Sequence, residues 1–347
     1  MPEGNVVHRL ARTFGSLYGG QVLRLSSPQG RFADGAAVLS GRRLMASEAW
    51  GKQLFLGFVP ADVSDDQVDG AASGPDLLWL RVHLGLYGAW TFAGSSDAPE
   101  VAHAIGAPRK RIGERETTPP VGGSVGSQGS TSSTSGGEWL PPEPRGQVRV
   151  RLLGDHAVAD LNGPTACEVI TTEEKTTVQA RLGPDPIRDD ADVDTFIAAV
   201  GRSRVTIAQL LMDQSVISGA GNIYRAEVLY RVGVDPLRPG RDVPAAVVRA
   251  IWDDLVDLMR EGVERGAIVT TRPEHRELGG TLPAEDQPRV RRGRTRQNAD
   301  GDPGAVPSEQ AFYVYHRAGL PCRICGTPVL IKELAGRNLF WCPTCQT

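Results

Sequence analysis

The sequence predicts an α+β protein, in which an N-terminal antiparallel β-sandwich or barrel with a flanking helix precedes a helical domain and a C-terminal four-cysteine module. Three observations favour this class. Short apolar runs bounded by Gly, Pro and Asp fill the first half of the chain. Apolar residues recur with helical spacing in the second half, and two Cys-x2-Cys pairs stand near the last residue. At 347 residues, the chain can bury the cores of two domains.

The first domain is expected over residues 1–170. Residues 4–18 place apolar side chains at helical spacing and predict an amphipathic helix, whose N-terminus carries Pro2 and Glu3. Short runs of Val, Leu, Trp and Phe predict strands, at 21–27, 36–50, 52–59, 76–92 and 147–161. Residues from about 113 to 146 include a Gly/Ser-rich stretch that cannot bury enough apolar surface to order itself, so a flexible insertion is expected there.

The apolar pattern changes after about residue 180. Residues 171–183 are expected to link the two domains, and residues 184–273 to form the helical domain. Its helices are predicted by apolar periodicity, at 192–201, 204–217, 221–234 and 244–269. Residues 274–308 are polar and rich in Pro, Gly and Arg, which indicates a disordered basic insertion ahead of the module at 309–347.

The charge of the chain is unevenly distributed. The formal net charge is −3, which taken alone argues against nucleic-acid binding, but arginines gather at 289–296 and acids at 62–69 and 185–194. A phosphate backbone senses local charge rather than the total, although such runs can also be plain solvated faces. We find no run of 18 apolar residues and no secretory segment. A cytoplasmic protein without membrane contact is therefore expected.

The pairs Cys322-x2-Cys325 and Cys342-x2-Cys345 are separated by 16 residues. Each pair forms a tight turn that presents two thiolates, and the residues between the pairs fit a short hairpin. This spacing is typical of one tetrahedral four-cysteine zinc site. The alternatives, two disulfides or a redox pair, are disfavoured in a cytoplasmic protein. The zinc would be structural, because four thiolates leave no open position for catalysis.

The first residues suit a specific kind of chemistry. Removal of Met1 leaves Pro2 as the amino terminus, a secondary amine with a pKa of roughly 7.7–8.0, so a useful fraction is neutral and nucleophilic near neutral pH. Attack on an aldehyde-like carbon would give a cationic iminium, and Glu3 could donate or accept the proton. The alternative is an ordinary frayed terminus at the start of a helix.

Four further features each allow two interpretations. The turn at 219–222 offers backbone amides and an asparagine to a phosphate, or is an ordinary helix–turn–helix hairpin. Lys52 precedes an apolar strand, where a lysine commonly snorkels at the strand edge, or it has a functional role that this residue alone does not specify. Leu86 and Tyr87 stand on a turn, either as loop packing or as a wedge for a base stack. Arg337 lies in the predicted zinc hairpin, as a solvated charge or as a bidentate phosphate ligand.

These features are specific in combination, although none is specific alone. MPEG at the start, GK before a strand, HxxLYG, QARLGPD, DQ-x4-GAGNIYRAE and CxxC-x16-CxxCQ stand in the order and spacing of one family. By these motifs the chain resembles the Fpg/Nei DNA glycosylases, and among them actinobacterial endonuclease VIII (Nei), over nearly its whole length outside the two insertions. The resemblance implies a β-sandwich, a helix–two-turn–helix domain and a zinc finger, with DNA in the cleft between the domains and a damaged base flipped out for excision.

The resemblance also implies roles for single residues. Pro2 matches the Schiff-base nucleophile that attacks C1′ of the flipped nucleotide, and Glu3 matches the proton donor at the sugar. Lys52 matches the lysine that binds phosphate and donates a proton in β-elimination, and Arg337 the zinc-finger arginine assigned to δ-elimination. The remaining matched positions are assigned to DNA contact: His83, Gly85, Leu86, Tyr87, Arg181 and Asn222.

Three departures from the family pattern concern the choice of lesion. Val6 replaces a glutamate often found at that position. Gly85 stands where better-known Nei enzymes have a glutamine that helps fill the void, so the wedge would rest on Leu86 and Tyr87. The Fpg arginine that contacts the opposite base has no clear counterpart.

The resemblance implies a bifunctional DNA glycosylase and AP lyase of base excision repair, active on oxidised bases through β,δ-elimination. Pyrimidines are favoured, because the chain has HxxLYG rather than the Fpg-like HxxMEG. The alternatives are a preference for oxidised purines and a non-catalytic zinc-containing DNA-binding protein. Damaged DNA, duplex or single-stranded, is the expected partner, and a monomer in the bacterial nucleoid is the expected form.

Overall fold

The computed structural model describes residues 2–63, 76–99, 104–106, 139–276, 306–307 and 309–347. The insertions expected at about 113–146 and 274–308 lie outside these residues, apart from 139–146, 274–276 and 306–307. Among the described residues, no helix has the length and apolar character needed to cross a bilayer.

In the described residues, the N-terminal half contains one antiparallel sheet of nine strands together with the helices α1 and α2. Its strands run in the order β6-β5-β8-β7-β1-β2-β3-β4-β9. The elements are α1 (Gly4–Tyr18), β1 (Val22–Ser26), α2 (Ala33–Leu39), β2 (Arg42–Trp50), β3 (Gln53–Val59), β4 (Leu78–His83), β5 (Ala89–Gly94), β6 (Ala104–Gly106), β7 (Val148–Leu153), β8 (Ala157–Asn162) and β9 (Ala166–Ile170).

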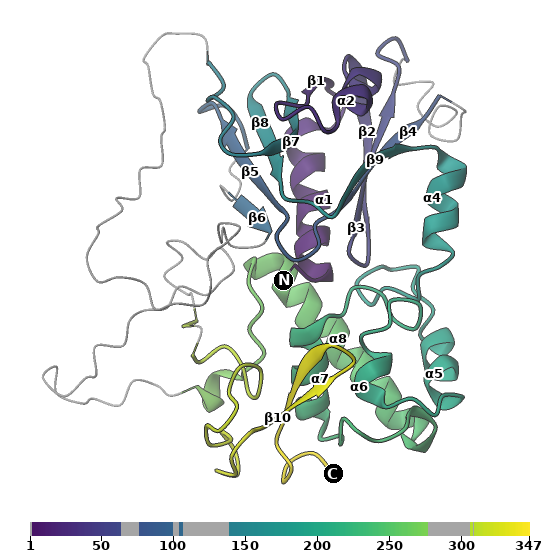
Figure 1. Ribbon diagram of the computed structural model, residues 1–347, viewed down its shortest axis with the longest axis vertical. Helices are drawn as coiled ribbons and strands as arrows, with labels where there is room; N and C mark the ends of the chain where they lie inside the picture. The colour runs from purple at the N-terminus through teal and green to yellow at the C-terminus, as the bar shows by residue number, and fades with distance from the viewer. Residues whose placement is uncertain (1, 64–75, 100–103, 107–138, 277–305, 308) are drawn as a thin grey trace, which may run out of the picture.

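The sheet folds at β1, which pairs with β2 on one side and with β7 on the other. Figure 1 shows α1 between the two halves of the sheet. Leu10 and Phe14 of α1 are fully buried in the core that the two halves share, and the Phe14 ring meets the Trp90 ring edge-on at 4.7 Å. Full burial of such a side chain contributes about 1.5–3 kcal/mol. The apolar face of α1 therefore fixes this helix inside the sheet.

The second half is helical and ends in a hairpin, so the predicted α+β class is confirmed. Its core is built from apolar side chains spaced along the helices, such as Phe196, Val228 and Leu255. The elements are α4 (Thr172–Gln179), α5 (Val193–Gly201), α6 (Ile207–Leu210), α7 (Asn222–Val232), η2 (Gly240–Asp242), α8 (Ala245–Arg265), η3 (Pro273–His275), β10 (Leu330–Leu334) and β11 (Arg337–Trp341).

Several segments differ from the prediction. The strands β6 and β9 were not predicted, and the runs at 76–92 and 147–161 each contain two strands joined by a turn. Residues 36–39 belong to α2 rather than to a strand, and the buried pair Ala36 and Leu39 has the spacing of a helix. The connection after β9 contains α4, which begins with a capping box between Thr171 and Glu174. The helix predicted at 204–217 is only the four residues of α6. Short apolar runs suit either a strand or a helix, so tertiary contacts decide between them.

Two parts of the N-terminal half reach the helical half. The N-terminal end of α1 and the turn between β2 and β3 both point toward the helices (Figure 1). Gly4 N donates to Gly219 O at 2.9 Å, three residues before α7 begins. The start of the chain, the β2–β3 turn and the start of α7 therefore meet at one place.

Candidate active site

Glu3 joins the first helix to a helix of the other domain. Its backbone carbonyl accepts from Val6 N at 3.0 Å and begins α1. Its side chain turns away and accepts from Gly221 N at 2.9 Å, Ile223 N at 2.8 Å and Tyr224 N at 3.4 Å. The side chain is fully buried. A carboxylate thus fills the N-terminus of α7, where the free amides and the helix dipole favour a negative group.

This contact changes the interpretation of the turn at 219–222. The sequence left open whether its backbone amides bind a phosphate or form an ordinary hairpin, and in the structure Glu3 occupies the amides of Gly221, Ile223 and Tyr224. The glycine at 221 is required by the same contact, because a Cβ there would lie 2.6 Å from the Glu3 carboxyl carbon. The anion that this helix end binds is therefore part of the protein.

Lys52 is the second residue of the two-residue turn between β2 and β3, closed by the pairing of Trp50 with Gln53. Burial lowers the pKa of Lys52, an effect that Glu3 opposes and Arg337 reinforces. No hydrogen bond or ion pair holds the Lys52 ammonium within the described part of the chain. A half-buried lysine with a lowered pKa loses its proton more readily than an exposed lysine, which suits proton transfer.

A cavity of about 240 Å³ opens beside Lys52. It is lined by residues of the N-terminal half and by one residue of the C-terminal hairpin: Pro2, Val7, Lys52, His83, Leu84, Gly85, Leu86, Thr165 and Arg337. Six of the residues matched to the family therefore meet at one cavity. The other four, Glu3, Tyr87, Arg181 and Asn222, do not line it. Thr165 is a lining residue that no sequence motif pointed to.

The loop between β4 and β5 carries the predicted wedge. Leu86 is 41% exposed and Tyr87 66% exposed, so both apolar side chains face solvent. Gly85 has φ +65°, and a Cβ there would come within 1.8 Å of the Thr165 hydroxyl oxygen. Thr165 thus fills the space that a side chain at position 85 would enter. His83, at the base of the loop, has its pKa lowered by burial and by the neighbouring charges of Lys52 and Arg81.

The C-terminal hairpin contacts α7 through a buried arginine. Asn222 Nδ2 donates to Asn338 O at 3.0 Å, and Arg225 Nη2 donates to the same oxygen at 2.9 Å. Arg225 also donates to the Asn222 side-chain oxygen. Burial lowers the pKa of Arg225 to about 10. Arg337 precedes Asn338 in β11 and is exposed on the cavity rim, so this contact positions it. Sequence motifs did not single out Arg225, because its partner lies in another domain.

The segment leading into the hairpin is held by a second buried carboxylate. Glu227 of α7 accepts from Tyr313 N and Val314 N at 2.8 Å and from Tyr315 N at 2.7 Å, and also from the Thr270 hydroxyl. Burial raises the pKa of Glu227, while these donors oppose the shift. The C-terminal module is thereby fixed to α7. Arg181, in contrast, is exposed before α5.

The four predicted cysteines form one metal site. Their sulfur atoms lie within 4.8 Å of one another, with Cys322 and Cys345 3.8 Å apart and Cys325 and Cys342 3.5 Å apart. Tetrahedral zinc with Zn–S bonds of about 2.3 Å needs sulfur atoms about 3.8 Å apart. The donor set therefore fits a single structural Zn²⁺, which would join both knuckles to the β10–β11 hairpin.

Comparison with known proteins identifies close relatives. Residues 182–273 match the family described as the formamidopyrimidine-DNA glycosylase H2TH domain, and residues 319–347 match the zinc finger found in FPG and IleRS. Endonuclease 8 1 of Mycobacterium tuberculosis (strain ATCC 25618 / H37Rv) is 40% identical over 347 residues, which cover 100% of both chains.

More distant relatives share the fold. The formamidopyrimidine-DNA glycosylase of Streptococcus pneumoniae (strain ATCC BAA-255 / R6) is 34% identical over 170 residues, 49% of this chain and 53% of that protein. The structure of Lactococcus lactis Fpg in complex with DNA containing an abasic site superposes with a TM-score of 0.62 at 16% identity and covers 99% of both chains.

We predict that Glu3→Gln destabilises the fold by about 1–3 kcal/mol, the cost of an unsatisfied buried polar group. The new amide would face N–H donors of α7, and the negative charge at the helix end would be lost. Urea unfolding measures the change. Glu264→Gln is the matched control, because that side chain is 70% exposed. Equal unfolding midpoints for both variants would contradict the capping role.

We also predict one zinc per chain, lost in Cys342→Ser. Removal of one thiolate leaves three ligands, and the hairpin should unfold at lower temperature because metal binding contributes to its folding. Elemental analysis and thermal unfolding measure both effects. Cys167→Ser is the control, since Cys167 lies on β9 outside the site and its replacement should keep the metal. A metal-free wild-type protein with an intact hairpin would refute the site.

Proposed function

Because this chain belongs to the Fpg/Nei family of DNA glycosylases, we propose that it excises oxidised bases from DNA and then cuts the strand as an AP lyase. The observation that carries the proposal is the cavity that Pro2, Lys52 and Arg337 line together. These residues lie at the start of the chain, in the β2–β3 turn and in the C-terminal hairpin. Glu3 lies directly beside the proposed nucleophile, and its carboxylate is fixed at α7.

Pro2 would act as the nucleophile once Met1 is removed. Its secondary amine attacks C1′ of the everted nucleotide, and the bond from C1′ to the damaged base breaks as the base leaves with a proton. The sugar ring opens to an iminium, which is cationic without further protonation and withdraws electrons from C2′. Glu3 would first take up the proton that the Pro2 nitrogen loses as the iminium forms, and would then return it to the ring oxygen of the sugar as the ring opens. Its three backbone donors hold the carboxylate in one orientation.

Lys52 and Arg337 would serve the eliminations. Loss of a C2′ proton breaks the C3′–O bond, and loss of a C4′ proton then breaks the C5′–O bond. Phosphate remains on both sides of a one-nucleoside gap. Both side chains line the cavity with their charges free of hydrogen bonds to the described residues. Two cations there suit the phosphates that flank the lesion, and the lowered pKa of Lys52 makes it a stronger acid.

The remaining matched residues would bind damaged DNA. Leu86 and Tyr87 project from the β4–β5 loop and could fill the gap that an everted base leaves. His83 and Gly85 line the cavity below them. Asn222 would contact the DNA backbone with its side-chain amide, either giving up its hydrogen bond to Asn338 O or keeping it alongside the DNA contact. The exposed Arg181 would contact the DNA backbone from the linker.

The preferred lesion would be an oxidised pyrimidine. Endonuclease 8 1 of M. tuberculosis matches over the full length of this chain, whereas the formamidopyrimidine-DNA glycosylase of S. pneumoniae matches over about half of it. The HxxLYG motif at the cavity is also the Nei-like form. Both observations support a pyrimidine substrate over a purine.

We expect borohydride to reduce the Pro2 iminium and to link the protein covalently to cleaved abasic DNA. A protein that retains one extra N-terminal residue should not be trapped, because the Pro2 nitrogen is then a peptide nitrogen without a nucleophilic lone pair. Gel analysis of the cross-linked product measures this. Lys52→Gln is the matched control and should still be trapped. Equal trapping of the blocked and free proteins would assign the nucleophile to another residue.

We expect Leu86→Ala to slow excision from duplex DNA much more than from single strands. Unstacking a duplex costs roughly a few kcal/mol, which a wedge offsets, whereas a single strand has little stacking to break. Single-turnover excision of thymine glycol from both forms measures the ratio. Leu330→Ala is the control, since Leu330 is also 41% exposed but lies in the zinc hairpin.

Equal losses on both substrate forms would remove Leu86 from the wedge role. In the same assay, the wild-type protein should excise thymine glycol faster than 8-oxoguanine paired with cytosine. The reverse order would place the protein with the purine-specific enzymes while leaving the chemistry unchanged.

A further inference from the structure

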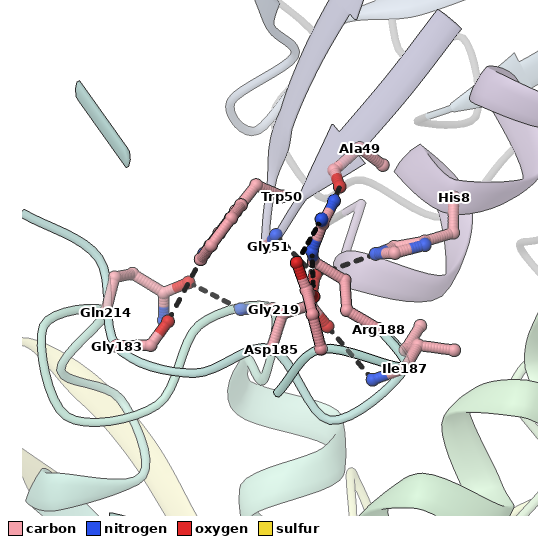
Figure 2. A network of polar contacts seen from close by, with 11 residues as sticks. His8, Ala49, Trp50, Gly51, Gly183, Asp185, Ile187, Arg188, Gln214 and Gly219 are labelled. Carbon is pink, nitrogen blue, oxygen red and sulfur yellow. Dashed lines mark hydrogen bonds and ion pairs between the residues drawn. The ribbon is translucent and has the colours of Figure 1, made fainter. Parts of the chain in front are cut away.

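The segment between α4 and α5 (residues 180–192), called the linker from here on, holds the tip of the β2–β3 hairpin through one buried carboxylate. Asp185 is fully buried, and its Oδ2 accepts from Gly51 N at 2.7 Å. The same oxygen lies 2.7 Å from His8 Nε2 on α1. Its Oδ1 accepts from Ile187 N at 3.1 Å. Figure 2 shows these donors converging on Asp185 from the hairpin, from α1 and from the linker itself.

Neighbouring residues of the linker also contact the tip of the β2–β3 hairpin. Arg188 Nη1 donates to Ala49 O at 3.3 Å, and its guanidinium stacks 4.4 Å from the centre of the Trp50 ring. Trp50 Nε1 in turn donates to Gly183 O at 3.3 Å. Figure 2 shows both side chains of this stack beside Asp185. Each residue from Ala49 to Gly51 therefore has a contact with the linker.

This arrangement bears on Lys52, which follows Gly51 in the turn. The Lys52 ammonium has no hydrogen bond or ion pair to a described residue, so its position depends on the backbone of the turn. Asp185 also contacts α1 through His8, five residues after Glu3. One carboxylate thus ties the turn that carries Lys52 to the helix that follows Pro2 and Glu3.

We propose that Asp185 is a positioning residue that sets Lys52 against Pro2 across the cavity. The inference rests on the role proposed for Lys52 and assigns Asp185 no contact with DNA. An asparagine at 185 would fill the same volume but lose the charge. The NH2 group of the asparagine would replace one carboxylate oxygen and would face either the N–H of Ile187 or the N–H groups of Gly51 and His8. At least one of these donors would then lose its acceptor.

A double-mutant cycle tests the proposal. Four proteins are compared: wild type, Asp185→Asn, Lys52→Gln and the double variant. Single-turnover nicking of a preformed abasic site is measured at saturating enzyme, together with borohydride trapping and DNA affinity. We expect Asp185→Asn to slow nicking about 10²-fold, the cost of misplacing a reacting group by about 1 Å, and to keep the trapping yield. The double variant should nick no more slowly than Lys52→Gln alone.

Asp254→Asn is the matched control. Asp254 is 17% exposed and forms an ion pair with Arg231 at 2.6 Å, away from the cavity, so its loss should lower stability and leave the nicking rate unchanged. Should Asp185→Asn fail to fold, His8→Phe in the same cycle keeps the ring volume and removes one donor to Asp185.

The outcomes separate this inference from the function on which it rests. If Asp185→Asn slows nicking by the same factor with and without the Lys52→Gln change, or does not slow it, the positioning role is overturned. If Lys52→Gln itself nicks at the wild-type rate, the role proposed for Lys52 fails, and the inference fails with it.

Discussion

The carboxylate of Glu3 at the first turn of α7 is the contact on which the rest of the site depends. It joins residues 218 positions apart and brings the first residues of the chain against the helical domain. Burying an uncompensated carboxylate would cost many kcal/mol, so the three amide donors of α7 are required wherever Glu3 is buried. The same contact excludes any side chain at position 221. It therefore fixes where Pro2 can be.

Two other buried carboxylates also accept hydrogen bonds from backbone amides of separate segments. Asp185 accepts backbone amides from the β2–β3 turn and from the linker. Glu227 accepts three successive amides of the segment that leads into the zinc finger. Each joins a separate segment to the rest of the molecule through backbone donors, whose geometry is fixed by the fold. None of the three acids lines the cavity. They instead fix the start of the chain, the turn before Lys52 and the segment that leads into the hairpin of Arg337.

The charge of the site differs from the charge of the whole chain. The net charge is −3, yet the ionisable side chains that line the cavity are Lys52, His83 and Arg337. Glu3 lies beside them with its carboxylate turned to α7. Because these basic residues come from three separate segments, they form no basic run in the sequence. A phosphate backbone would nevertheless meet a locally positive surface.

Sequence by itself determined the features that are encoded locally. The apolar spacing of residues 4–18 specifies α1, and the two Cys-x2-Cys pairs with their intervening hairpin specify the metal site. The motif residues of the cavity were also visible, because a family pattern preserves order and spacing. Tertiary structure alone decided the partners: Glu3 with the α7 amides, Gly51 with Asp185, and Asn222 with Asn338. It also placed Thr165 at Gly85 and turned residues 36–39 into a helix. The physical reason is that periodicity and spacing act through neighbouring residues, whereas a buried hydrogen bond is chosen by which backbone donors the folded chain leaves unsatisfied.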